Sequence, residues 1–171
     1  MCKLISLILD RKTEITNLSY LFEKFDFEAN IIENKNLKPQ FDSDCYFIKL
    51  TKGCCDCESG LGNLANNTEP IFDDDYFLKL GVSQEYLDDL KKETQADENN
   101  KRKDINRWQN FLKELSIGEK VEKIGILFHD YTTKMESEIF TIKGKTETKI
   151  SDLSPEFLSN MQFDTLYYIL S

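Results

Sequence analysis

The sequence contains no long apolar run. Spanning a bilayer takes about 20 apolar residues, and the longest apolar stretches fall far short of that. The stretch from Leu4 to Leu9 runs straight into Asp10, Arg11 and Lys12, so it does not resemble the core of a secretory signal either. We therefore expect a cytoplasmic protein without membrane contact. Its five cysteines, an odd number, are then expected to be reduced thiols.

Positive charge is also scarce. Lys and Arg number 22 against 31 Asp and Glu, which gives a net charge of −9. Nucleic-acid binding draws most of its affinity from basic side chains on phosphates, and anionic membranes attract basic segments, so this composition disfavours both. The tripeptide Lys101-Arg102-Lys103 is too short to form a basic patch. An acidic chain fits a protein partner with a basic surface.

Complete catalytic and phosphate-binding motifs are missing. His129 is the only histidine, and in a strand its neighbour Asp130 would point to the opposite face. Gly60-Leu61-Gly62 lacks the further glycine or the Lys-Ser/Thr of a phosphate loop. Asp73-Asp74-Asp75 lacks the pattern of a calcium loop, and it is typical of a charged helix start. These absences favour a non-catalytic role.

The hydrophobic periodicity predicts one α+β domain over residues 1–171. A chain of this length buries about 70% of its unfolded surface, enough for a core of its own. Because the predicted helices are concentrated in the middle of the chain, we expect a mixed or antiparallel sheet of about four to five strands with helices packed mainly on one face. Strands are predicted at 2–9, 45–51, 124–129 and 138–150, helices at 15–25, 72–80, 84–90, 105–115 and from Ser154, and a strand or helix end at 166–170.

Two details of this prediction stay open. The polar stretch 91–103 is either a solvated continuation of the helix before it or a flexible connector. Strands 124–129 and 138–150 are placed to pair as a hairpin across residues 130–137.

Three cysteines lie within four positions directly after the predicted strand 45–51. They are Cys54, Cys55 and Cys57, in a turn that also contains Gly53, and exposed thiols in such loops are reactive. A redox role is one hypothesis, since an adjacent Cys54–Cys55 bridge would be strained and strained bridges are labile. Another is that one or two of these thiols are only buried small hydrophobic groups.

A metal site is the third hypothesis for these cysteines. Soft thiolates select zinc or a similar ion in a tetrahedral site. The spacing departs from the Cys-x-x-Cys pairs of zinc ribbons and no second pair follows, so the site would need Cys2, Cys45 or His129 from elsewhere in the fold. A nucleophilic pair of His129 with Cys55 or Cys57 is a related alternative.

Two functions follow as hypotheses. The first is a small acidic intracellular binding or regulatory module, of the inhibitor or immunity type, that acts through protein–protein contacts. It predicts that charge reversal at 73–75 or 85–93 weakens capture of the partner. The alternative is a thiol- or zinc-dependent protein built on the Cys54-Cys55-Asp56-Cys57 loop, with Cys2 and His129 as helpers. It predicts that Cys57→Ser changes metal content, redox behaviour or stability.

Overall fold

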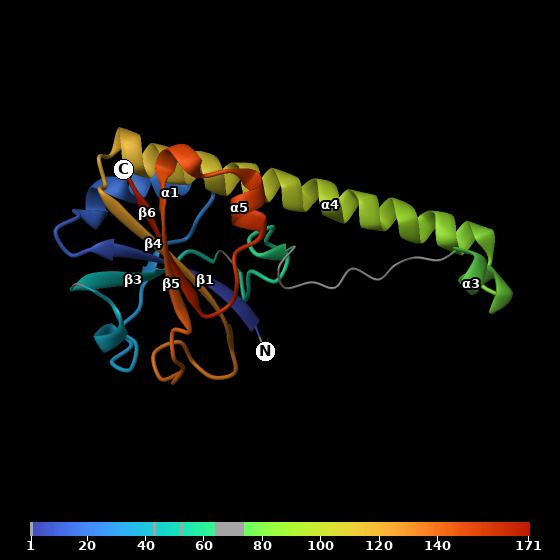
Figure 1. Cartoon of the computed structure of the whole chain (residues 1–171), viewed down its shortest axis with the longest axis horizontal. Coiled ribbons are helices and arrows are strands. Elements are labelled where there is room, and N and C mark those ends of the chain that lie inside the picture. The colour runs from blue at the N-terminus through green and yellow to red at the C-terminus, as the bar shows by residue number, and fades with distance from the viewer. Residues whose placement is uncertain (1, 43, 52, 64–73) are drawn as a thin grey trace.

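The computed structural model describes residues 2–42, 44–51, 53–63 and 74–171. In these residues the chain has an α+β fold in which a six-stranded mixed sheet runs in the order β2-β3-β1-β4-β6-β5 (Figure 1). This confirms the predicted fold class, with slightly more strands than expected. The strands are β1 (Cys2–Asp10), β2 (Asn30–Ile31), β3 (Cys45–Lys49), β4 (Lys123–Tyr131), β5 (Gly144–Lys149) and β6 (Thr165–Leu170).

Serine caps set the starts of two helices, α4 and α5. The hydroxyl of Ser83 accepts a hydrogen bond from the Tyr86 amide at 3.2 Å, and the hydroxyl of Ser154 accepts one from the Phe157 amide at 3.1 Å. Each cap satisfies an amide that has no partner within its helix. The helices are α1 (Ser19–Lys24), which follows a 3-10 turn at Ile15–Leu18, α3 (Asp74–Lys79), α4 (Gln84–Lys113) and α5 (Pro155–Ser159).

The polar stretch 91–103 lies wholly within α4, so its helical alternative is the one observed. Ion pairs one helical turn apart support it, at 2.7 Å between Asp97 and Lys101 and at 3.0 Å between Asp89 and Lys92. Residues 72 and 73, where the preceding helix was expected to begin, lie outside the described residues, and α3 occupies most of the rest of that prediction.

Strands β1 and β4 form the centre of the sheet. They pair antiparallel from Cys2–Tyr131 to Leu9–Ile124, and both of their faces are covered. This explains their nearly continuous apolar sequences, because a strand buried on both faces has no solvent side for polar residues.

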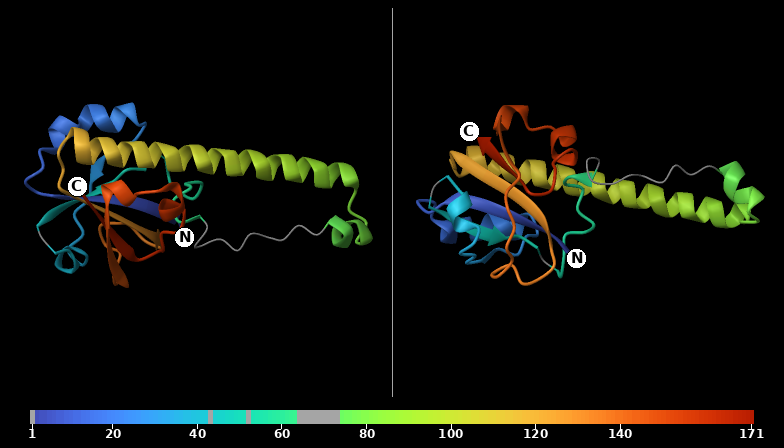
Figure 2. Two further views of the ribbon diagram at one scale, coloured as in Figure 1. Left: turned by 45° about the horizontal axis from the view of Figure 1, so that its top comes forward. Right: turned by 60° about the horizontal axis from the view of Figure 1, so that its bottom comes forward.

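The two faces of the sheet are covered differently. On one face α1, α4 and α5 pack over a core that includes Trp108, Phe111 and Leu158 (Figure 2). On the other face loop residues take the place of helices, among them Leu37 and Met135. The prediction of helices mainly on one face is therefore confirmed.

The predicted hairpin between 124–129 and 138–150 is wrong. Strand β4 pairs with β1 and β6, whereas β5 pairs in parallel with β6. The reason lies in the chain between β4 and β5, which crosses the second face of the sheet. Phe140 and Ile142 pack there against the core, so this segment serves as a cover and not as a strand.

Helix α4 extends far beyond the sheet and forms an arm (Figure 1). A helix of 30 residues is about 45 Å long. Between Leu87 and Ile105 no residue of this helix is buried. Helix α3 lies at the far end of the arm, where an ion pair joins Asp74 to Lys91.

Candidate functional site

Residues 53–60, which we call the cysteine loop, lie beside the first half of β1 and take the place of a paired strand there. Pairing between β1 and β3 begins only at Ser6, so the strand before it needs other partners. The Asp56 amide donates to the Lys3 carbonyl at 2.7 Å, and the Ile5 amide donates to Asp56 Oδ2 at 2.7 Å. The Leu50 amide donates to the Ile5 carbonyl at 3.4 Å. The loop thus satisfies backbone groups that β3 leaves unpaired.

Asp56 and Lys3 form the half-buried polar centre of this loop. Burial raises the pKa of Asp56, while hydrogen bonds from the Thr51 hydroxyl and the Ile5 amide oppose that rise. Burial lowers the pKa of Lys3 against the attraction of Asp56. Lys3 Nζ also donates to the Ser59 carbonyl at 3.2 Å, so both charges have hydrogen-bond partners.

A second anchor joins the loop to α4. One carboxylate oxygen of Asp104 accepts hydrogen bonds from the Ser59 hydroxyl at 2.6 Å and from the Gly60 amide at 2.9 Å. Its other oxygen pairs with Arg107 at 2.5 Å. The cysteine loop is therefore held between the central strand and the base of the arm.

All five cysteines are free thiols in different surroundings. Cys54 and Cys57 are exposed, and Cys55 is half-buried. All three border a surface hollow of about 680 Å³ between the loop and α4. Cys2 is exposed, whereas Cys45 is buried and its burial raises the pKa of its thiol to about 11.

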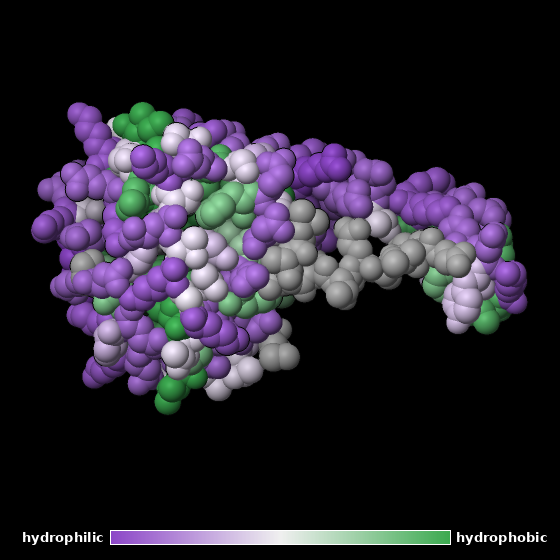
Figure 3. Space-filling view, viewed as in Figure 1, coloured by the Kyte–Doolittle hydropathy of each residue, from purple (hydrophilic) through white to green (hydrophobic). Residues whose placement is uncertain are grey.

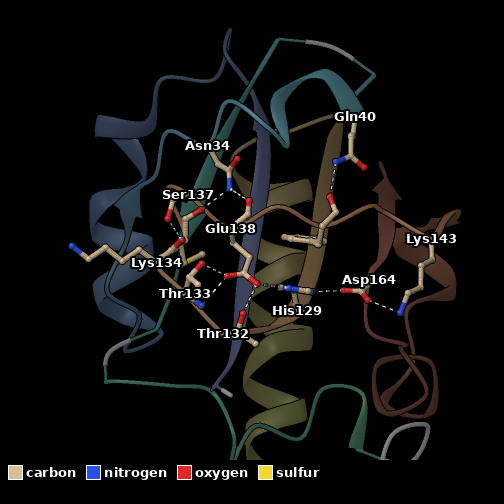
Figure 4. A network of polar contacts seen from close by, with 12 residues as sticks. Asn34, Gln40, His129, Thr132, Thr133, Lys134, Ser137, Glu138, Lys143 and Asp164 are labelled. Carbon is tan, nitrogen blue, oxygen red and sulfur yellow. Dashed lines mark hydrogen bonds and ion pairs between the residues drawn. The ribbon is translucent and has the colours of Figure 1, made fainter.

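His129 belongs to a different network, on the second face of the sheet (Figure 4). Its Nδ1 pairs with Asp164, which also pairs with Lys143 at 2.7 Å. Its Nε2 faces Glu138 Oε1 at 3.8 Å, and Phe140 stacks on its ring with a centroid distance of 3.6 Å. Among the described residues, no cysteine takes part in these contacts, so the pairing of His129 with Cys55 or Cys57 gains no support.

Within residues 2–42, 44–51, 53–63 and 74–171, no group of three or more His, Cys, Asp or Glu side chains is arranged to hold a metal ion. Zinc at the cysteine loop therefore stays a prediction from sequence.

Glu138 holds the loop between β4 and β5 on the sheet (Figure 4). Its carboxylate accepts hydrogen bonds from the hydroxyls of Thr133 and Thr132 and, at 2.8 Å, from the Thr133 amide. These bonds, led by that of the Thr133 hydroxyl, lower the pKa of Glu138 to about 2. Asn34 fixes the same loop by donating to the Met135 carbonyl at 2.6 Å and to the Glu138 carbonyl at 3.0 Å.

Acid is expected to loosen this loop through Glu138. Because the pKa of Glu138 falls from 4.5 to about 2 on folding, the carboxylate stabilises the fold above pH 4.5 and loses that effect as the pH falls toward 2. Glu138→Gln should therefore lower the midpoint of urea unfolding at neutral pH, and the difference from the natural sequence should shrink as the pH falls through this window. Glu136→Gln, at an exposed position of the same loop, is the control. A difference that is constant with pH would contradict the assignment.

Sequence reasoning missed the partners of His129. Asp164 lies 35 residues further on and Glu138 lies in a segment predicted as strand, so no local pattern links them. The backbone of Asp164 is unusual, but this is seen only in the structure. Its φ is 59°, a conformation that favours Asp and Asn among non-glycine residues.

The far end of the arm carries a surface of a different kind. Tyr76, Leu78 and Leu80 on and after α3, with Tyr86 in the first turns of α4, expose 57%, 40%, 64% and 62% of their surface. In Figure 3 green and pale residues gather there at the end of a largely purple helix. We call these four side chains the arm-tip surface.

Comparison with known protein families, curated proteins and solved structures finds no match for this chain. Among the described residues, no helix combines the length and apolar character that crossing a bilayer requires.

Proposed function

We propose that the chain is a binding module that captures a protein partner through the arm-tip surface. The observation that carries the proposal is the position of its apolar side chains. Eight large apolar side chains are exposed among the described residues, and four of them lie together at the end of the arm. Clustered exposed apolar groups with a polar rim are typical of interaction sites, whereas scattered ones need no explanation.

The form of α4 supports this role. Between Leu87 and Ile105 the helix is polar except for Leu90 and Ala96 and has no buried residue, so it gains little from packing in that stretch. Its length instead separates the arm-tip surface from the sheet by several helical turns. A projecting helix of this kind presents a small apolar surface to another molecule.

The charge around the arm-tip surface indicates the chemistry of the partner. Residues 74–93 hold six carboxylates and three lysines, in a chain whose net charge is −9. The partner is therefore a protein whose surface combines apolar side chains with a basic rim. Electrostatic complementarity of this sort mainly speeds association and selects the partner, while apolar contacts in the centre supply most of the affinity.

The test compares capture by matched variants. Leu80→Ser combined with Tyr86→Ser should lower the amount of partner retained from a lysate of the source organism by at least about tenfold, the effect of losing roughly 1.4 kcal/mol at an interface centre. The control is Ile139→Ser, which removes an apolar side chain that is 79% exposed on the opposite part of the molecule. Quantitative mass spectrometry of the retained proteins makes the comparison.

Charge reversal provides the second comparison in this test. Asp88→Lys with Asp89→Lys should weaken capture of the same protein, and added salt should weaken capture by the natural sequence. Retention that is equal for the tip variants and for Ile139→Ser would contradict the proposal. So would a retained protein whose binding does not respond to salt.

A further inference from the structure

The thiols of the cysteine loop lie close to one another. Cys54, Cys55 and Cys57 all border the same hollow against α4. Asp56, between Cys55 and Cys57, is fixed to β1 through its amide and its carboxylate. The residue between Cys55 and Cys57 is therefore anchored to β1, which limits how far the two flanking thiols can move apart.

Chain geometry favours one pair among these three thiols. Consecutive Cα atoms lie about 3.8 Å apart across a trans peptide, which is shorter than the roughly 4.4–6.8 Å that a disulfide spans. Cys54 and Cys55 are therefore too close along the chain for an unstrained bridge. Residues two apart, such as Cys55 and Cys57, come within that range wherever the chain is bent.

Small reagents have access to this pair. Cys57 is exposed, Cys55 is half-buried, and both border the hollow between the loop and α4. Hydrogen bonds from Cys57 and Cys54 lower the pKa of Cys55, while the contact with Cys55 raises that of Cys57. The thiolate is the nucleophile in exchange reactions, so these surroundings distinguish an attacking thiol from its neighbour.

We propose that Cys55 and Cys57 form a reversible intramolecular disulfide by exchange with a low-molecular-weight disulfide, with Cys55 attacking and Cys57 resolving. In the first step the Cys55 thiolate bonds to one sulfur of the reagent and displaces the other as a thiolate. In the second step Cys57, having lost its proton, attacks the Cys55 sulfur and displaces the remaining half. Two electrons pass from the protein to the reagent, and the two protons of the cysteines end on the two released thiols.

Closing the bridge would act on the base of the arm. Asp56 lies inside the ring that the bridge forms, and its hydrogen bonds fix the loop to β1. Three residues further on, Ser59 and Gly60 bind Asp104 of α4. The redox state of the pair is thereby linked to the junction of loop, sheet and arm, a regulation that is separate from capture at the arm-tip surface.

The experiment treats the reduced full chain with oxidised glutathione and follows free thiols and intact mass. The natural sequence should lose two thiols and the mass of two hydrogens, with fragmentation placing the bridge between Cys55 and Cys57. Cys57→Ser should accumulate glutathione on Cys55, because the resolving thiol is gone. Cys55→Ser should slow the reaction of the loop, and Cys54→Ser, the matched control, should still form the bridge.

Other outcomes would overturn the proposal. They are a bridge that needs Cys54, stable glutathione adducts on the natural sequence without a bridge, and a Cys57→Ser variant that reacts no faster at Cys55 than at Cys54. Buried Cys45 serves as an internal reference, since it should stay unmodified while the chain is folded. Circular dichroism of each variant checks that the fold is retained.

Discussion

Replacing Phe111 by alanine is expected to lower the free energy of unfolding by about 3–5 kcal/mol, the usual cost of removing a fully buried aromatic side chain. Phe111 has no exposed surface and lies where α4 crosses the sheet. Its ring contacts those of Phe22, Phe25, Phe27 and Trp108, with centroids 4.8 to 6.0 Å away. The cavity left by alanine would open at the centre of this group.

Urea unfolding followed by circular dichroism measures the effect. The control is Tyr86→Ala, which removes an aromatic side chain of the same helix that is 62% exposed. That change should alter the free energy of unfolding by no more than about 0.5 kcal/mol. Equal losses for the two variants would mean that the base of α4 is not packed as described.

Gly60→Ala is expected to destabilise the fold by about 1–3 kcal/mol, the range for forcing extra atoms into a packed site. A Cβ at this position would lie 2.4 Å from the Lys101 carbonyl oxygen and 2.6 Å from Cγ1 of Ile105. The first of these atoms belongs to the backbone of α4, so the helix cannot yield by changing a rotamer. The loop must move away from the arm instead.

Gly53→Ala is the matched control, since a Cβ there meets no atom within 4 Å. Fluorescence of Trp108, the single tryptophan, reports the change because its side chain lies on α4 beside the hollow. An unfolding midpoint that is the same for Gly60→Ala and Gly53→Ala would contradict the close approach of loop and helix.

Much of the fold could be predicted from local patterns. The central strands β1 and β4 are nearly continuous apolar stretches, and helix starts at Ser83 and Ser154 follow from capping chemistry. The pairing of the strands could not be predicted in this way. The alternation at Ile139–Ile142 looks like a strand, but Phe140 and Ile142 cover the second face of the sheet. Periodicity predicts which side chains of a segment are buried. It does not predict whether that segment is a paired strand or a loop that covers the sheet.

For the candidate sites too, local features could be predicted from the sequence and long-range contacts could not. Cysteine spacing drew attention to Cys54, Cys55 and Cys57, and in the structure these three residues border one hollow. His129, which the same hypothesis joined to them, is held by Asp164 from a distant part of the chain. The arm-tip surface was foreseen only as acidic helices, because exposure of Leu80 and Tyr86 depends on how far α4 extends beyond its contacts.

The two outermost strands of the sheet have a consequence for assembly. β2 is only two residues long, and β5 has the sequence Gly-Lys-Thr-Glu-Thr-Lys, in which charged and hydroxyl side chains alternate. A short strand offers few free backbone groups, and lysines along an outer strand oppose the docking of a further one. The sheet is thereby protected against growth into fibrils by strand addition, even though its interior strands are among the most apolar segments of the chain.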